Sequence, residues 1–286
     1  MKKYRSLLIL FFLSGFLFSC QKHIVEYNSV NVSSDEAEFQ LHYFVPLTAS
    51  TANNIYKVEI NGQVIANNSS PLTTYNAIPS GAVGRFYATK KGQTNIKLYK
   101  GEALQPVYDQ NFDLKAGKQN VFVYDFSKAP IVFDNGFPYT PLVTEKTGST
   151  AWIKFYNFLY EKDGVPTDLK LQYQCQYVIN DTTKAKSDWV NVGKPLKFGE
   201  ATGWEPVHVN VSTTTITSGS DRVDYRIKVI DQDGNDLGDL QVLNASNKFI
   251  TYSDWWTAAV GRRYHHILSG MRADKPNCAV RQFTAL

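Results

Sequence analysis

The chain has 286 residues, of which 43% are hydrophobic, and carries 30 Lys and Arg against 26 Asp and Glu. This hydrophobic content excludes wholesale disorder, which requires few apolar residues and a high net charge. Three of the basic residues lie in the first 19 positions, so the remainder has 27 basic groups (30 − 3) against 26 acidic ones, a net charge of +1. A nearly neutral chain lacks the basic surface that nucleic acids require, so we expect no nucleic-acid partner.

Residues 1–19 have the pattern of a secretory signal peptide. Lys2, Lys3 and Arg5 form a basic start, and a largely apolar run follows from 7 to 18. This run is shorter than the roughly 20 residues that span a bilayer and has the length of a signal-peptide core. It ends in Leu-Phe-Ser-Cys, which resembles the lipobox of bacterial lipoproteins. The resemblance implies cleavage before Cys20 and attachment of a diacylglycerol to its sulfur.

The lipobox predicts both the localisation of the protein and its lipid anchor. Two or three acyl chains hold a protein stably on a membrane, because each buried CH₂ contributes about 0.8 kcal/mol. We therefore expect an outer-membrane lipoprotein of the cell envelope, with the membrane as a partner through the lipid on Cys20 and a polar, lipidated tether at 20–36. The tether lacks the acidic run of surface-displayed lipoproteins, so the periplasmic and the surface-exposed face both stay open. An ordinary cleaved signal with an incidental Cys is the alternative.

Beyond the tether, the first half of the chain has the pattern of short strands. Apolar and polar residues alternate at 39–45 and at 56–60, and the second run leads into Asn61-Gly62, a strong hairpin signal. Turn signals recur about every ten residues, a spacing typical of sandwiches and barrels. No amphipathic stretch of convincing helical length is found. We predict an all-β fold with a first β-sandwich module at 37–130.

The second half repeats this plan. Alternating strands are predicted at 169–178, 207–211 and 224–230. The stretch 131–150 between the halves contains several Pro residues and has the composition of a linker with an edge segment. Similar strand orders in similar lengths indicate tandem copies of one module. We predict two tandem antiparallel β-sandwich modules of the immunoglobulin-like kind, the second at 151–286.

Several strand and turn patterns resemble a known family. They are the strand at 153–157, Gly-Glu-Ala-Thr-Gly-Trp at 199–204, the strand at 225–231 and Gly-Arg-Arg-Tyr at 261–264. Together with the lipobox around Cys20, they resemble the tandem β-sandwich lipoproteins of Bacteroidota that are grouped as "domain of unknown function 4397". The resemblance covers most of the mature chain and implies the same fold. The family has no assigned activity, so it implies no catalytic residues.

No catalytic motif occurs in the sequence. It lacks the nucleophile elbow, the paired zinc-binding His of metalloproteases, the phosphate-binding loop and the dinucleotide-binding glycines. His265 and His266 are adjacent, but neighbours on a strand point to opposite faces and cannot chelate one ion together. We expect them to be strand residues, one of them half-buried. The protein is therefore predicted not to be an enzyme, and a hydrolase with a scattered site of Asp and Glu is the alternative.

One loop could hold a metal ion. Calcium takes six to eight oxygen ligands, and the loop supplies closely spaced oxygens from Asp231, Asp233, Asn235 and Asp236. Gly234 is fourth rather than sixth in this loop and no Glu closes it, so the pattern departs from an EF-hand. A hairpin turn is the competing interpretation. Calcium is a cofactor only under the first interpretation, and no other cofactor is expected.

Two cysteines remain once Cys20 is lipidated. Cys175 and Cys278 both lie in the second half, and the cell envelope permits disulfides. A bridge between them would close a long loop, worth about 4.7 kcal/mol in the chain-entropy model. Two buried free thiols are the alternative.

Trp255 and Trp256 are the candidate ligand-binding residues. Exposed aromatic side chains stack on sugar rings, which is the usual basis of carbohydrate binding by β-sandwiches. Because adjacent strand residues face opposite ways, we expect one of the two to pack inside, and core or inter-domain packing is the alternative for both. The sequence predicts a lipid-anchored, non-enzymatic binding or scaffolding protein with a glycan or envelope protein as partner. The alternative is a carbohydrate-binding or adhesin subunit displayed on the cell surface.

Overall fold

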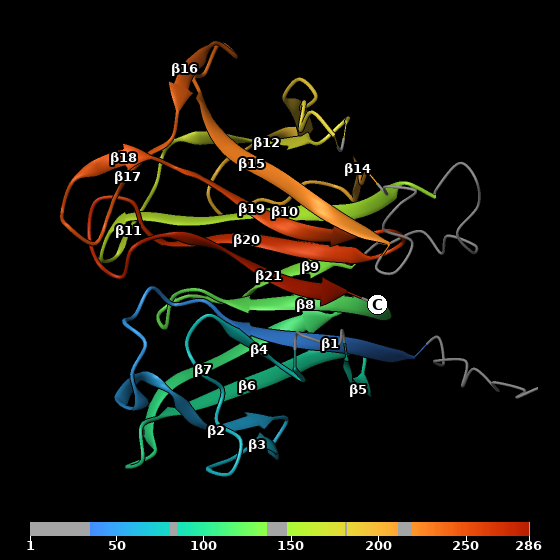
Figure 1. Cartoon of the computed structure of the whole chain (residues 1–286). Helices are drawn as coiled ribbons and strands as arrows, with labels where there is room; N and C mark the ends of the chain where they lie inside the picture. The colour runs from blue at the N-terminus through green and yellow to red at the C-terminus, as the bar shows by residue number, and fades with distance from the viewer. Residues whose placement is uncertain (1–34, 81–84, 136–147, 181, 211–218, 286) are drawn as a thin grey trace, which may run out of the picture. The chain divides into compact units, whose positions relative to one another are not determined.

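A computed structural model describes residues 35–80, 85–135, 148–180, 182–210 and 219–285. Cys20, the signal peptide and almost all of the tether lie outside the described residues. Within those ranges the chain is built from strands, with one turn of 3₁₀-helix, η2, at Thr51–Asn53 (Figure 1). None of the described helices is long and apolar enough to cross a membrane.

The first sandwich is formed by two sheets. Sheet A has the order β4-β1-β8-β9, with β5 also paired to β1, and sheet B has the order β3-β2-β6-β7. The strands of sheet A are β1 (Glu36–Tyr43), β4 (Asn76–Ile78), β5 (Tyr87–Lys90), β8 (Gly117–Val123) and β9 (Ile131–Asp134). Those of sheet B are β2 (Ile55–Ile60), β3 (Gln63–Ala66), β6 (Gly92–Lys100) and β7 (Gln105–Leu114). Their facing side chains form the first core, which includes Phe39, Leu41, Ile96 and Leu98.

The second sandwich has the same plan. Sheet C has the order β11-β10-β20-β21, with β14 paired to β10, and sheet D has the order β13-β12-β15-β16, with β19 paired to β15. The strands of sheet C are β10 (Thr150–Lys162), β11 (Val165–Pro166), β14 (Glu205–His208), β20 (Arg263–Met271) and β21 (Ala279–Ala285). Those of sheet D are β12 (Lys170–Tyr177), β13 (Val190–Leu196), β15 (Ser220–Ile230), β16 (Asp236–Asp239) and β19 (Ser253–Ala259). A separate hairpin pairs β17 (Gln241–Leu243) with β18 (Phe249–Thr251).

The predicted all-β sandwich fold is confirmed, and one detail of the pairing differs. The prediction of purely antiparallel sheets is wrong for one pair in each sandwich, because β1 runs parallel to β8 and β10 runs parallel to β20. Parallel neighbours need a long connection between them, and in each sandwich that connection contains all the strands of the opposite sheet together with two short strands of the same sheet. Local alternation of residues carries no information about such a distant partner. The predicted hairpin does occur between β2 and β3, where Asn61 and Gly62 both have positive φ, as this turn requires.

A third core joins sheet A to sheet C. Alternate residues of a strand point to opposite faces, so β1 sends Leu41 into the first core and His42 to the other side of sheet A. The third core consists of Phe44, Tyr75, Ala77, Phe122, Tyr156, Phe158, Ile267 and Phe283. Sheets A and C are thus covered on both faces, whereas the outer face of sheet D carries exposed side chains.

Buried polar side chains cross this third core. His42 Nε2 donates to Asn120 Oδ1 at 3.2 Å, and Asn120 Nδ2 donates to Asn135 Oδ1 at 3.1 Å. A hydrogen bond of 2.9 Å joins the Tyr156 hydroxyl to His265 Nδ1. The two imidazole centroids lie 6.4 Å apart, and His42 Nδ1 and His265 Nε2 have no hydrogen-bond partner among the described residues. Burial lowers the pKa of His42 to about 3 and holds that of His265 well below its usual value.

The adjacent histidines of β20 point to opposite faces, as the pleat requires. His265 contacts Tyr156, whereas His266 packs in the second sandwich and forms a 2.8 Å hydrogen bond with the Tyr173 hydroxyl. The expectation that one of them is half-buried is wrong, because both are about 1% exposed. The physical reason is that β20 lies in a sheet with a core on each side.

Candidate binding site

The exposed tryptophan lies on the outer face of sheet D. On β19, Trp256 points into the second core and is 5% exposed, whereas Trp255 points outward and is 49% exposed. The two adjacent tryptophans are therefore divided between the faces. Trp256 contacts the buried rings of Tyr225 and His266, so it is a core residue and only Trp255 is available to a ligand.

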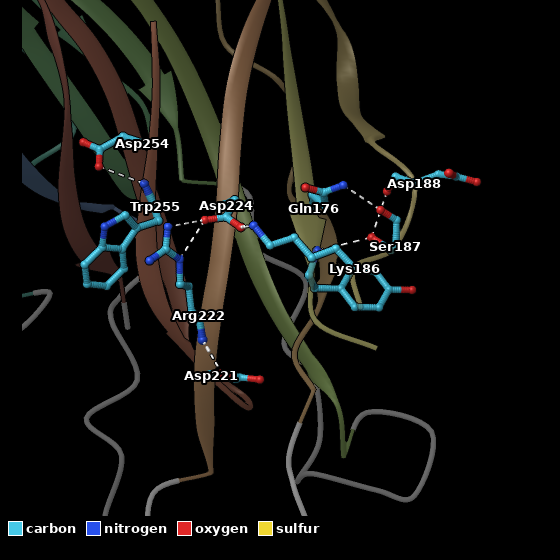
Figure 2. A network of polar contacts seen from close by, with 10 residues as sticks. Gln176, Lys186, Ser187, Asp188, Asp221, Arg222, Asp224, Asp254 and Trp255 are labelled. Atoms are coloured by element: carbon cyan, nitrogen blue, oxygen red, sulfur yellow. Dashed lines mark hydrogen bonds and ion pairs between the residues drawn. The ribbon is translucent and has the colours of Figure 1, made fainter. Parts of the chain in front are cut away.

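Three strands place a polar network beside Trp255. Asp224 on β15 lies opposite Trp255 on β19 and opposite Gln176 on β12, so the three side chains form one row across the sheet. Figure 2 shows Arg222 between the indole of Trp255 and the carboxylate of Asp224. Its guanidinium lies 4.7 Å from the indole centroid, and its Nε and Nη2 donate to Asp224 Oδ1, both at 2.7 Å. The arrangement fixes the position of a half-exposed aromatic ring.

Asp224 is the common acceptor for two cations. Lys186 Nζ donates to Asp224 Oδ2, while Arg222 binds the other oxygen. Burial of the carboxylate raises the pKa of Asp224, but the hydrogen bonds from Lys186 and Arg222 outweigh it and hold the pKa below its usual value. The side chain of Asp224 is only 12% exposed, whereas those of Lys186 and Arg222 are 42% and 52% exposed. The surface therefore presents two cations over one sheltered carboxylate.

A second stack of arginine on tryptophan lies on the same face. The guanidinium of Arg226, next but one to Asp224 on β15, lies 4.4 Å from the ring centroid of Trp189. Its Nε donates to Gln174 Oε1 at 2.8 Å, and Gln174 Nε2 donates to Asn191 Oδ1 at 2.8 Å. Sequence reasoning missed Arg222, Asp224 and Arg226. The signal was the alternation of these charged residues with Val223 and Tyr225, which gives β15 one polar face.

A cavity of about 290 Å³ opens between the edge strands β13 and β14. The residues that line it include Cys175, Val190, Val207 and His208. Burial raises the pKa of the Cys175 thiol, so this thiol stays protonated at neutral pH and is a poor nucleophile.

The disulfide interpretation is wrong in this structure, because Cys175 and Cys278 are both free and buried. Cys175 lines the same cavity as Val207, which lies near the Arg263 end of β20. Cys278 lies against Gly270, toward the other end of that strand. The strand length from Arg263 to Gly270 is about 23 Å at roughly 3.3 Å per residue. A disulfide needs Cα atoms about 5.5 Å apart.

The candidate calcium loop has the hydrogen bonding of a turn. Asp231 Oδ1 accepts from the backbone N–H groups of Asp233 and Asn235, and its Oδ2 accepts from the Asn235 side chain. Asp236 accepts from the N–H of Gly238 and pairs with Lys228 at 3.0 Å. Within the described ranges, no group of three or more His, Cys, Asp or Glu side chains is placed to hold a metal. The geometry favours the turn interpretation.

Comparisons with known proteins identify no family for this chain. No family model and no curated protein matches the chain. Among the similar solved structures is a candidate cell adhesion protein from Parabacteroides distasonis, with 10% identity, a TM-score of 0.22 and coverage of 88% of this chain and 98% of that chain. At this TM-score the similarity supports no inference about function. The resemblance to the lipoprotein family stays a prediction.

Proposed function

We propose that the protein is a lipid-anchored cell-envelope protein that binds a glycan without converting it, and that the outer face of sheet D is its binding surface. The observation that carries the proposal is Trp255, an exposed indole that Arg222 and Asp224 hold in one position. A side chain that is already ordered loses little conformational entropy when a ligand binds. Such rigid, amphipathic rings are the usual anchors of recognition surfaces.

The chemistry of the row suits a sugar. An indole offers a flat apolar surface to the apolar face of a sugar ring, and Gln176, Arg222 and Lys186 supply amide and cationic donors to hydroxyl groups around it. The lipid anchor is supported by the lipobox that ends at Cys20. The non-enzymatic character is supported by the absence of any catalytic motif from the sequence.

Affinity electrophoresis through gels that contain different polysaccharides tests the glycan proposal. At least one polysaccharide should retard the wild-type protein, and the variant Trp255→Ala should lose most of that retardation. The variant Phe249→Ala is the matched control, because Phe249 is also an exposed aromatic residue but lies on the separate β18 strand. Unretarded migration in every gel, or equal retardation of Trp255→Ala and wild type, would overturn the proposal.

The anchor is tested in cells by metabolic labelling with radioactive palmitate. The wild-type protein and the Cys278→Ser control should take up the label, and the Cys20→Ser variant should not. Protease treatment of intact and lysed cells then tells the two faces of the membrane apart, since only a surface-exposed protein is digested before lysis. Label that persists in Cys20→Ser would contradict attachment at this residue.

A further inference from the structure

We propose that the glycan bound by sheet D is acidic: a polysaccharide whose carboxylate or sulfate groups pair with Arg222 and Lys186 while it lies across the strands between Trp255 and Trp189. This inference rests on the proposed function, because it names the class of ligand for the same face. It is carried by the distribution of charge on that face and by the spacing of the two tryptophans.

The charge on this part of the face is positive where it meets solvent. Arg222 and Lys186 are about half exposed, and the one carboxylate that they share, Asp224, is sheltered behind them. Arg222 uses Nε and Nη2 on Asp224, and the described residues give its Nη1 no partner. A guanidinium binds carboxylates and sulfates through several parallel donors, so an anionic group on a sugar beside Trp255 would meet both cations.

The acids nearest to Arg222 and Lys186 do not cancel their charge, whereas Asp239 pairs with Arg226 and Lys228 farther along the face. Asp221 and Asp254 alternate with the outward residues of β15 and β19, and so belong to the opposite side of the pleat. Each accepts a backbone N–H, Asp221 from Arg222 and Asp254 from Trp255. Figure 2 shows Asp188 on the far side of Ser187 from Asp224. The exposed surface between the indole and Lys186 is therefore lined by cations and amides.

The two tryptophans set the length of the ligand. Trp255 lies on β19, and Trp189 immediately precedes Val190 of β13, which pairs with Cys175 next to Gln176. The backbones of the two residues are separated by the strand order β13-β12-β15-β19, which is three inter-strand spacings, or about 14 Å at roughly 4.8 Å each. This span is longer than one sugar ring. The face is therefore matched to a chain of sugars, with an arginine beside each aromatic ring.

The test compares the full chain, in detergent, against matched pairs of probes. Polygalacturonate is paired with its fully methyl-esterified form, which keeps the backbone and removes the charge, and dextran sulfate is paired with dextran. We expect retardation or calorimetric binding with at least one charged probe, none with its neutral partner, and weakening as salt is raised. The two charged probes distinguish carboxylate from sulfate. Oligomers should bind more tightly than the monosaccharide.

Two variants locate the charge dependence. Arg222→Gln and Lys186→Gln should each weaken binding to the charged probe by about tenfold or more, the size expected for a lost hydrogen bond to a charged group. Arg222→Gln also removes the cation that stacks on the Trp255 indole and could weaken binding by freeing that ring. Lys186→Gln removes a cation and leaves this stack in place, so it tests the charge alone. Lys97→Gln is the control, because Lys97 forms an exposed ion pair with Asp109 on sheet B.

The outcomes separate the two proposals. Equal binding of charged and neutral probes, lost in Trp255→Ala, would overturn the acidic ligand and keep the glycan-binding function. Binding to charged probes that is unchanged in both glutamine variants would also overturn this inference, because residues other than Arg222 and Lys186 would then bind the anionic groups. No binding to any charged or neutral polysaccharide would overturn both.

Discussion

Gly270 is a residue whose backbone leaves no room for a side chain. It lies in β20 with a φ of +99°, and a Cβ atom there would lie 2.8 Å from both the Asn277 carbonyl oxygen and the Cys278 Cα. These neighbours are backbone atoms and cannot rotate away. Gly238 has a similar φ of +106°, but nothing lies within 4 Å of its Cβ position. The two glycines separate backbone strain from steric exclusion.

We predict that Gly270→Ala lowers the free energy of unfolding more than Gly238→Ala does. The strain of positive φ costs about 1–3 kcal/mol at either site, and Gly270→Ala adds a clash that must displace the Asn277–Cys278 backbone. Urea denaturation of the two variants measures the difference. Equal destabilisation by the two variants would show that the Asn277–Cys278 backbone can move away from the new Cβ atom without lowering the free energy of unfolding.

The candidate site was partly predictable at this scale. The division of Trp255 from Trp256 follows from the two-residue period of a strand, so the sequence alone predicts one exposed indole. The loop at Asp231 was likewise open to the turn interpretation. Arg222 and Lys186 could not be assigned to the site from the sequence. Lys186 lies in a loop 38 residues from Asp224, and no local pattern indicates that both cations bind the same carboxylate.

At the scale of elements, β10 departs from simple alternation. Its run of residues from Ala151 to Tyr160 is almost continuously apolar and buried, which is typical of strands covered on both faces. The sequence predicts a strand at 153–157, but the predicted strand alone does not reveal that both of its faces are covered. Strands such as β2, with a single buried face, keep the alternating pattern and were predictable. The parallel pairing of β10 with β20 depends on residues more than a hundred positions apart, so local patterns could not reveal it.

Phe122 on β8 is the centre of the third core. Its ring lies 4.9 Å from that of Phe158 and 5.1 Å from that of Tyr156, both on β10 of the other sandwich, and 4.3 Å from the imidazole of His42. We predict that Phe122→Ala destabilises the protein by about 3–5 kcal/mol, the usual effect of emptying an aromatic core position. Phe249→Ala, at an exposed aromatic residue, should stay within about 0.5 kcal/mol of wild type. Thermal or denaturant unfolding measures both, and a small effect of Phe122→Ala would mean that the contact between sheets A and C contributes little to stability.

At the scale of the whole molecule, the buried histidines make stability depend on pH. Burial lowers the pKa of His42 and His266 to about 3 and holds that of His265 well below its usual value, against about 6.5 in an unfolded chain. Below pH 6.5 these histidines therefore take up protons in the unfolded chain but stay unprotonated in the folded chain. Stability is full above pH 6.5 and falls as the pH drops toward 3, by up to about 1.4 kcal/mol per pH unit for each histidine.

The groups around His42 and His265 act in both directions. The hydrogen bond to Asn120 raises the pKa of His42 and weakens the effect, whereas the neighbouring imidazoles and the Lys154 cation on β10 lower the pKa of His265 and strengthen it. Among the described residues, no carboxylate acts on the pKa of either imidazole, so none offsets the positive charge that protonation would add. We predict that denaturant unfolding shows a steep loss of stability between pH 6.5 and 4.5, and that His42→Gln makes this slope shallower. His208→Gln is the comparison variant: burial also lowers the pKa of this more exposed histidine, so this variant should make the slope shallower by less than His42→Gln does. An unchanged slope in His42→Gln would contradict the role of the buried pair.

The parallel ladder between β1 and β8 decides how the molecule responds to mechanical load. β1 is the first described strand, so a pull on the chain ahead of it enters at Glu36, while β8 passes that load onward from its far end at Val123. Because the two strands run side by side in the same direction from Ala37 to Tyr43, the pull acts at opposite ends of the ladder. The load is shear, shared by all the rungs at once, whereas an antiparallel hairpin pulled at its open end breaks one rung at a time. If the chain ahead of β1 is a lipid-anchored tether and sheet D binds a long ligand, as proposed, the β1–β8 ladder is the first described element to bear the load between them.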